Sequence, residues 1–186
     1  MKEKRPERFA PGPLEPEPGG LALARGMARR GAAVLKRGDG VIPVDPARMK
    51  SAVVIFPALG SLAARIMIER PLEDEAGFVR EAFSEYGVKP SVRVVAIEPS
   101  GEQVEEAARD AAAADIVVLF CFDAHLYPSN KRLLDEVQRR ARRLVVVLMR
   151  DPYDAEFIGD KTACVTGFGF RMCQLEAAIA VILRKP

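Results

Sequence analysis

Five short apolar runs divide the sequence, and the apolar residues between them recur at close to helical spacing. The runs are Ala52–Phe56, Val92–Ile97, Ile116–Phe122, Leu144–Met149 and Ala163–Thr166. Several of them are almost continuous Val, Ile and Leu, which is typical of strands covered on both faces in a parallel sheet. We therefore predict five strands with helices between them.

Four segments carry the apolar spacing of an amphipathic helix. They are Phe78–Tyr86 followed by Gly87, the alanine-rich stretch from Ser100 to Ala113, Leu133–Ala141 and Met172–Ile182. Ser100 with Gln103 forms a capping box at the second helix, and Ser129 is predicted to cap the third. Upstream, apolar residues from Leu21 to Leu35 recur at helical spacing, which predicts a helix that ends at the turn Gly38-Asp39-Gly40.

The alternation of strands and helices predicts an α/β fold, a three-layer α/β/α sandwich with a mainly parallel sheet. Residues 21–186 are expected to form a single domain, because this length and an apolar fraction of 49% suffice for one core. Residues 1–20 are rich in proline and charge. We expect them to be an arm that is disordered or extended over a neighbouring surface.

Positive and negative charges nearly balance, with 28 Lys and Arg against 26 Asp and Glu. Because the two signs are interspersed, the chain is not expected to bind nucleic acid or a membrane surface. One dense group, Arg139, Arg140, Arg142 and Arg143, ends a predicted helix. The helix macrodipole favours cations there, so a solvated helix end explains the group better than a phosphate site.

Cysteine usage and the start of the sequence bear on location. Cys121, Cys164 and Cys173 lie in apolar surroundings without metal-type spacing, which predicts buried thiols in a reducing compartment. The sequence opens on charge and proline, and no apolar stretch is long enough to span a membrane. We expect a cytoplasmic protein without a metal or other cofactor.

The most interesting chemistry lies where two predicted strands end. In a parallel sheet, ligands usually bind beyond the carboxyl ends of the strands. Asp123-Ala124-His125 follows one strand, with Asn130 a few residues later, and it contains the only histidine. A histidine can act as acid, base or ligand near neutral pH, but a single one makes a poor metal site. A structural hydrogen-bonding role and a binding or catalytic role are both open.

The string Arg150-Asp151-Pro152-Tyr153-Asp154 follows the next strand. Pro152 disfavours a helical conformation at Asp151, and Asp154 could cap a short helical turn that runs through Phe157. Alternatively, Arg150 and Asp154 could offer charge and hydrogen bonds to a partner surface or a sugar. The glycines of Thr166-Gly167-Phe168-Gly169-Phe170 lack the spacing of a nucleotide loop and are better explained by a tight turn.

Three stretches together resemble the C-terminal domain of glycoside hydrolase family 3, in its bacterial β-N-acetylhexosaminidase branch. The first is Gly31-Ala32-Ala33-Val34-Leu35-Lys36-Arg37 followed by Val41-Ile42-Pro43-Val44. The second joins Ala114-Asp115-Ile116-Val117-Val118 and Asp123-Ala124-His125-Leu126 to Val145-Val146-Val147-Leu148 and Asp151-Pro152-Tyr153-Asp154. The third is Thr166-Gly167-Phe168-Gly169 followed by Leu175-Glu176-Ala177-Ala178. The likeness covers residues 21–184 in order.

The resemblance implies that the family's catalytic aspartate and its acid/base histidine–aspartate dyad lie on a separate N-terminal barrel. A barrel of eight β/α units takes about 250 residues, so we expect no catalytic residue in this sequence. The expected function is a non-catalytic module that binds a carbohydrate or a partner, such as a separate glycosidase barrel chain. Its candidate binding residues are Asp123, His125, Asn130, Arg150, Tyr153 and Asp154. The alternatives are a small hydrolase that uses Asp123, His125 and Asp154, and a self-associating scaffold.

Overall fold

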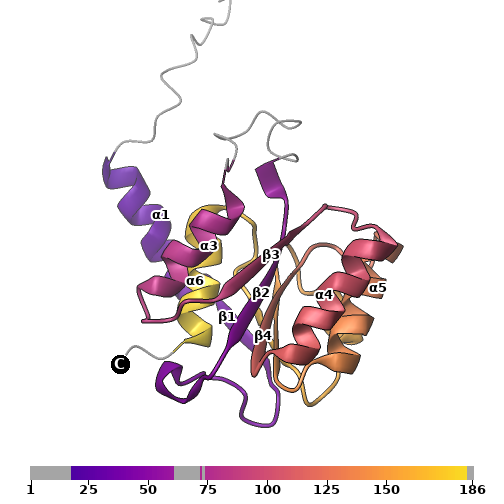
Figure 1. Cartoon of the computed structure of the whole chain (residues 1–186). Coiled ribbons are helices and arrows are strands. Elements are labelled where there is room, and N and C mark those ends of the chain that lie inside the picture. Colours follow the sequence, from indigo (N-terminus) through magenta and orange to yellow (C-terminus); the bar gives the residue numbers. More distant parts are fainter. Residues whose placement is uncertain (1–17, 61–71, 73, 184–186) are drawn as a thin grey trace, which may run out of the picture.

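The computed structural model describes residues 18–60, 72 and 74–183 (Figure 1). Its helices are α1 (Pro18–Gly31), α3 (Glu75–Ser84), α4 (Gly101–Ala113), α5 (Pro128–Arg140) and α6 (Met172–Ile182). Its strands are β1 (Ala33–Arg37), β2 (Ala52–Pro57), β3 (Ser91–Val95), β4 (Ile116–Cys121), β5 (Leu144–Leu148) and β6 (Ala163–Thr166). Two short 3₁₀ helices are η1 (Pro46–Arg48) and η2 (Tyr153–Phe157). The predicted alternation of strands and helices is confirmed.

The strands form one sheet in the order β1-β6-β5-β4-β2-β3. All neighbouring strands are parallel except β1, which runs antiparallel to β6 at one edge. Every residue of β4 and β5 is buried, because both strands lie inside the sheet with helices on both of its faces. The two most continuous apolar runs of the sequence therefore supply its central strands.

Helices cover both faces of the sheet, so the molecule has the three predicted layers (Figure 1). On one face, Phe56, Phe83 and Ile179 belong to a core beneath α3 and α6, and α1 packs against α6. On the other face, Leu119, Leu134 and Val146 belong to a second core beneath α4 and α5. The two hydrophobic cores hold the sheet rigid between them.

The prediction of one long first helix is wrong at its C-terminal end. Helix α1 ends at Gly31, and the next residues form β1, whose Ala33 pairs with Thr166 and whose Arg37 pairs with Ala163. The side chains of β1 are compatible with a strand as well as with a helix. Pairing with the edge of β6 stabilises the strand. Gly38-Asp39-Gly40 is a turn, as predicted, but it follows a strand. At Gly38, φ is 58° and a Cβ would lie 2.3 Å from Ala163 N, so only glycine fits there.

The helix caps agree with the sequence in one case and differ in another. The Ser100 side chain accepts a bond from Gln103 N, and the reciprocal bond completes the predicted capping box of α4. In α5 the N-cap is Tyr127, and Pro128 takes the first helical position, so the predicted cap at Ser129 is wrong. Proline is well suited to that position because it has no N–H to leave unpaired. The Ser129 hydroxyl is buried without a hydrogen-bond partner.

The structure bears on three further predictions, which concern the N-terminal arm, the cysteines and membrane-spanning helices. Residues 1–17 of the predicted arm lie outside the described residues, and α1 begins at Pro18. Cys121 and Cys164 are buried as predicted, but Cys173 is half-buried, and none of the three forms a disulfide. None of the helices in the described residues combines the length and apolar character needed to cross a membrane.

Candidate functional site

The six candidate residues converge at the carboxyl ends of β4 and β5. Asp123 and His125 follow β4, Asn130 lies in the first turn of α5, and Arg150, Tyr153 and Asp154 follow β5. Because β4 and β5 are parallel neighbours, their following segments leave the same edge of the sheet side by side. We call these six residues the strand-end cluster.

Asp154 is the centre of the cluster. Its Oδ2 accepts the N–H of Ala124 at 2.8 Å, and its Oδ1 accepts the N–H of His125 at 2.8 Å. The same Oδ1 lies 2.8 Å from Nδ1 of the His125 ring. The predicted cap of the helical turn through Phe157 is therefore wrong, since η2 has Pro152 at its N-cap and no side-chain cap bond. Asp154 instead fixes the segment that follows the neighbouring strand.

A second bond crosses between the same two segments in the opposite direction. Arg150 Nη1 donates to Asp123 Oδ2 at 2.6 Å. Asp123 is 3% exposed, and its backbone has a φ of 43°, a left-handed conformation that aspartate tolerates better than most residues. Burial raises the pKa of the Asp123 carboxyl, while the nearby Arg150 charge opposes that rise. The Asp123–Arg150 pair and Asp154 together clamp the two segments to each other.

Asn130 and Tyr153 complete the cluster from two sides. The buried Asn130 amide donates to the carbonyl of Phe122 at 2.6 Å, which holds the start of α5 against the end of β4. The Tyr153 ring packs edge-on against His125, with ring centroids 5.5 Å apart. Tyr153 is 68% exposed, so most of its ring faces outward. The side chain of His125 is 22% exposed between them.

A thiol lies beneath the cluster without the properties of a nucleophile. Cys121 Sγ is 3.8 Å from Asp154 Oδ2. Burial, and next the charge of Asp154, raise the pKa of the Cys121 thiol well above its usual value. A thiol must lose its proton to attack a substrate, so Cys121 stays inert at neutral pH.

The hollow that described residues line between the ends of β2 and β4 is small. Helix α3 follows β2 on one face of the sheet and α5 follows β4 on the other, so the sheet has its topological switch between these two strands. The hollow at that point, lined by described residues that include Pro57, Phe122 and Asn130, has a volume of about 10 Å³. This volume accommodates a single water molecule and no sugar ring.

Two large apolar side chains are exposed at strand ends next to the cluster, a feature that the sequence analysis missed. Leu126 is 58% exposed after β4, and Phe168 is 49% exposed after β6. Phe168 N donates to the buried Thr166 Oγ1 at 3.0 Å, and Gly167 leaves no room for a side chain, since a Cβ would lie 2.5 Å from Gln174 O. Together with Tyr153, which follows β5, these residues lie beyond the carboxyl ends of the three neighbouring strands β4, β5 and β6. We call Leu126, Tyr153 and Phe168 the apolar tips.

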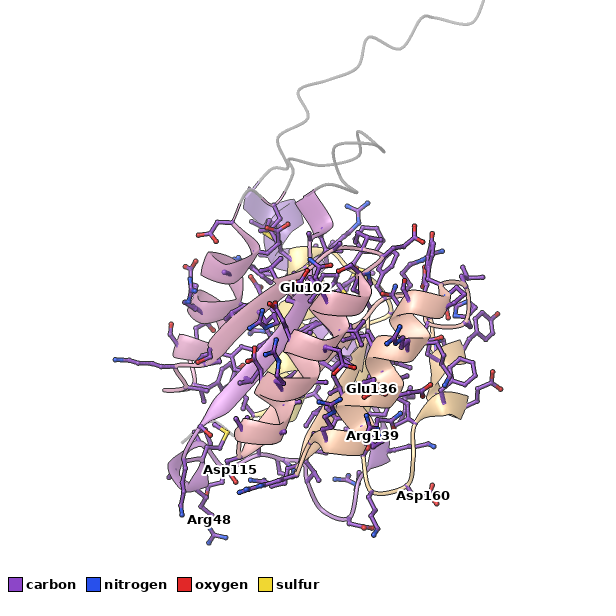
Figure 2. All side chains as sticks on the ribbon, turned by 45° about the vertical axis from the view of Figure 1, so that its right-hand side comes forward. Arg48, Glu102, Asp115, Glu136, Arg139 and Asp160 are labelled. Atoms are coloured by element: carbon purple, nitrogen blue, oxygen red, sulfur yellow. The ribbon has the colours of Figure 1, made fainter. Side chains whose placement is uncertain are left out.

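The arginine group behaves as a helix end. Arg139 and Arg140 lie in the last turn of α5, where both pair with Glu136, and Arg140 also contacts Glu105 on α4. Figure 2 shows Glu136 and Arg139 projecting together from the outer surface of α5. Arg143 lies 3.8 Å from Asp115. These ion pairs involve three of the four arginines, and the Arg140–Glu105 pair joins α4 to α5.

The described residues contain no group of three or more His, Cys, Asp or Glu side chains that could hold a metal ion. The strand-end cluster supplies one imidazole and two carboxylates, and both carboxylates already accept short hydrogen bonds from protein groups. The arrangement is therefore suited to holding two loops in place. One dyad, His125 with Asp154, also has the geometry of an oriented imidazole.

Solved structures with the same fold come from glycoside hydrolases. A glycoside hydrolase family 3 β-N-acetylglucosaminidase from Paenibacillus sp. str. FPU-7 matches with a TM-score of 0.73 at 15% identity, over 97% of this chain and 33% of that one. A fungal multi-domain β-N-acetylglucosaminidase of the same family has a TM-score of 0.65 at 19% identity, over 88% and 18%. A β-glucosidase from Listeria innocua has 0.59 at 15%, over 91% and 27%.

At these identities the shared property is the fold. No family model and no curated protein sequence matches the chain. The chain spans a third or less of the length of these solved structures. The fold implied by the resemblance to the family's C-terminal domain is therefore confirmed.

Proposed function

We propose that this chain is a non-catalytic accessory module that docks on a glycosidase barrel through the apolar tips. The barrel would belong to the same longer protein or to a separate chain. The observation that carries the proposal is a set of exposed apolar side chains on well-held loops. Leu126 and Tyr153 lie on the two segments joined by Asp154 and Arg150, and Phe168 lies on the loop after β6, where its N–H donates to Thr166 Oγ1.

The use of the polar groups favours a protein partner over a sugar. A saccharide site needs hydrogen-bonding groups that are free to meet hydroxyls. Here Asp154 accepts two backbone N–H groups, Asp123 accepts Arg150, and Asn130 donates to a backbone carbonyl. The exposed side chains of Leu126, Tyr153 and Phe168 remain, and aromatic residues are enriched in protein interfaces.

The solved structures with the same fold also support docking on a glycosidase barrel. In them, a region with this fold is joined to a much longer glycoside hydrolase chain. Large exposed apolar side chains that gather at one edge are typical of a surface that another protein covers. A preorganised loop platform also lowers the entropy lost on docking, which increases affinity without new contacts.

The decisive experiment measures binding between this chain and the family 3 barrel encoded with it, in the same reading frame or in a neighbouring gene. The barrel is expressed separately and titrated by calorimetry against wild-type protein and against the double variant Tyr153→Ala/Phe168→Ala. We expect the double variant to weaken binding by about a hundredfold, since each aromatic anchor contributes roughly 1–2 kcal/mol.

Leu23→Ala is the matched control, because Leu23 is 62% exposed on α1, which carries none of the apolar tips. It should leave the affinity unchanged. Binding that is insensitive to the aromatic pair, or equally sensitive to Leu23, would show that the docking surface lies elsewhere. Absence of any binding to the barrel would reject the proposal.

A small hydrolase is the second candidate, and the 2.8 Å contact between Asp154 Oδ1 and His125 Nδ1 favours it. A carboxylate on Nδ1 orients an imidazole so that its Nε2 can exchange a proton with a substrate. The test is turnover of 4-nitrophenyl N-acetyl-β-D-glucosaminide by the purified chain. We expect none. Turnover that survives purification and disappears in His125→Ala would replace the accessory role with a catalytic one.

A further inference from the structure

A second hollow lies between α1, α3 and α6, and it shares no lining residue with the strand-end cluster. Its volume is about 140 Å³. The lining residues are Arg25, Arg29, Ala82, Glu85, Tyr86, Cys173, Glu176, Ala177 and Ala180. Figure 1 shows these three helices side by side on one face of the sheet. We call this space the three-helix hollow.

Small side chains create the hollow. Helix α1 packs along α6, and α3 also contacts α6. Ala82, Ala177 and Ala180 face the junction, and they are too short to fill the space between the helices. Tyr86, which is 8% exposed, joins these alanines in the floor.

The rim of the hollow is charged, and its charges are only partly paired. Arg25 Nε lies 3.4 Å from Glu176 Oε2. Arg29 and Glu85, by contrast, form no ion pair with any residue that the structure describes. Arg25 and Arg29 are four residues apart on α1 and therefore share one face of the helix. One cation and one anion are thus left available at the same opening.

The behaviour of Tyr86 supports the closeness of these charges. Burial raises the pKa of the Tyr86 phenol, Glu85 and Glu176 raise it further, and Arg29 lowers it. Charged groups of both signs around the hollow are therefore close enough to the buried phenol to change its pKa. This agrees with the lining residues and with the ion pair between α1 and α6.

We propose that the three-helix hollow binds a small zwitterion, namely an aliphatic α-amino acid. Arg29 holds its carboxylate, Glu85 holds its ammonium group, and the alanine floor receives its side chain. This binding site goes beyond the docking role proposed above and is independent of it, because the two regions share no residue.

Size and charge select this ligand class. A buried cavity of about 150 Å³ takes up a molecule of benzene size, so about 140 Å³ suits a ligand of six to ten non-hydrogen atoms. A phosphate would meet the carboxylates of Glu85 and Glu176, and a simple amine would meet two guanidinium groups. Only a ligand with both charges is favoured by every charged group on the rim.

The experiment titrates the ¹⁵N-labelled full chain with L-valine and follows its amide resonances. Two analogues each lack one charge: 3-methylbutanoate has no ammonium group, and 2-methylpropylamine has no carboxylate. We expect L-valine to shift amides around Arg29, Tyr86 and Glu176 with a Kd on the order of 1 mM. Each analogue should bind at least about tenfold more weakly.

Two surface variants test the assigned roles. Arg29→Gln and Glu85→Gln should each weaken L-valine binding by about tenfold, because each removes one charge-assisted contact. Arg30→Gln and Glu81→Gln are matched controls on the same helices, exposed and outside the hollow, and should bind L-valine like the wild type. No saturable shift with L-valine, equal binding of the three compounds, or unchanged affinity in Arg29→Gln would each overturn the proposal.

Discussion

The strand-end cluster and the three-helix hollow contain the same kinds of side chain in opposite arrangements. In the cluster, Asp154 and Asp123 are buried and accept protein N–H groups, and the apolar side chains of Leu126 and Phe168 are exposed beside them. In the hollow, the apolar residues form the floor, and Arg29 and Glu85 stand at the opening. The charges of the first region hold two loops together, whereas Arg29 and Glu85 of the second form no ion pair with any residue that the structure describes.

This difference shows why residue type alone is a poor guide to function. A buried carboxylate with a histidine beside it suggests catalysis, yet Asp154 accepts hydrogen bonds from two backbone N–H groups and so has a structural role. An exposed arginine on a helix does not by itself indicate a binding site, yet Arg29 lines an unfilled space. The partners of a charge decide its role.

The largest effect should come from removing the carboxylate at the centre of the cluster. Asp154→Ala leaves the N–H groups of Ala124 and His125 without an acceptor, so we expect the free energy of unfolding to fall by about 3–5 kcal/mol. Glu85→Ala, the same change at the rim of the hollow, should alter it by less than about 0.5 kcal/mol. Urea denaturation measures both. Equal losses in the two variants would erase the distinction between the regions.

Thiol reactivity distinguishes the same two regions. Burial raises the pKa of the Cys164 thiol to about 12 and that of Cys121 well above its usual value, whereas Cys173 is half-buried in the hollow. With 5,5′-dithiobis(2-nitrobenzoate), one thiol of the native protein should react at least about a hundredfold faster than the other two. Cys173→Ser should remove that fast phase. A second fast thiol would mean that the cluster opens readily.

The pH dependence of stability should contain a contribution from Asp123. Its pKa is raised in the folded state, chiefly by burial, so the folded protein holds a proton that the unfolded chain has already released. This contribution is therefore fully present below the ordinary value of 3.8 and is lost as pH rises through the folded pKa. Denaturation of Asp123→Asn across that range should lack the decline. If the two profiles are parallel, the carboxyl is better solvated than its surroundings suggest.

The smallest expected change is an increase in the free energy of unfolding. Ser129 lies beside Asn130 at the start of α5, and its buried hydroxyl has no partner. Ser129→Ala removes that unpaired group and improves helix propensity, so unfolding should require up to about 1 kcal/mol more. Thermal denaturation is sufficient to detect the change. A loss of stability would indicate a hydrogen bond from Ser129 to water or to a neighbour.

The interior of the fold was readable from the sequence because the signals are local. Ala163–Thr166 forms a strand with the predicted bounds, and the central strands follow the continuous apolar runs. The meeting of Asp123 with Arg150 follows from parallel strands that end at one edge. Strand β1 was missed because its pairing with β6 joins distant parts of the chain, which no local period reveals.

The sequence did not predict the side-chain contacts of the strand-end cluster or the existence of the three-helix hollow. Whether Asp154 caps its own turn or the neighbouring segment depends on the path of two loops. The three-helix hollow depends on how α1, α3 and α6 lie against one another, and its alanines read in the sequence as ordinary helix formers. Side-chain identity is local information, but an opening between three helices is a property of their arrangement.

The antiparallel pairing of β1 with β6 also governs how the molecule is made. During synthesis, β1 leaves the ribosome early and has no edge to join until β6 has followed it. Until then the exposed Val34 and Leu35 lack the neighbouring strand, and α1 lacks α6 to pack against. A chain in which β6 has not yet joined the sheet therefore has an open edge along β5, to which another strand or a chaperone could bind.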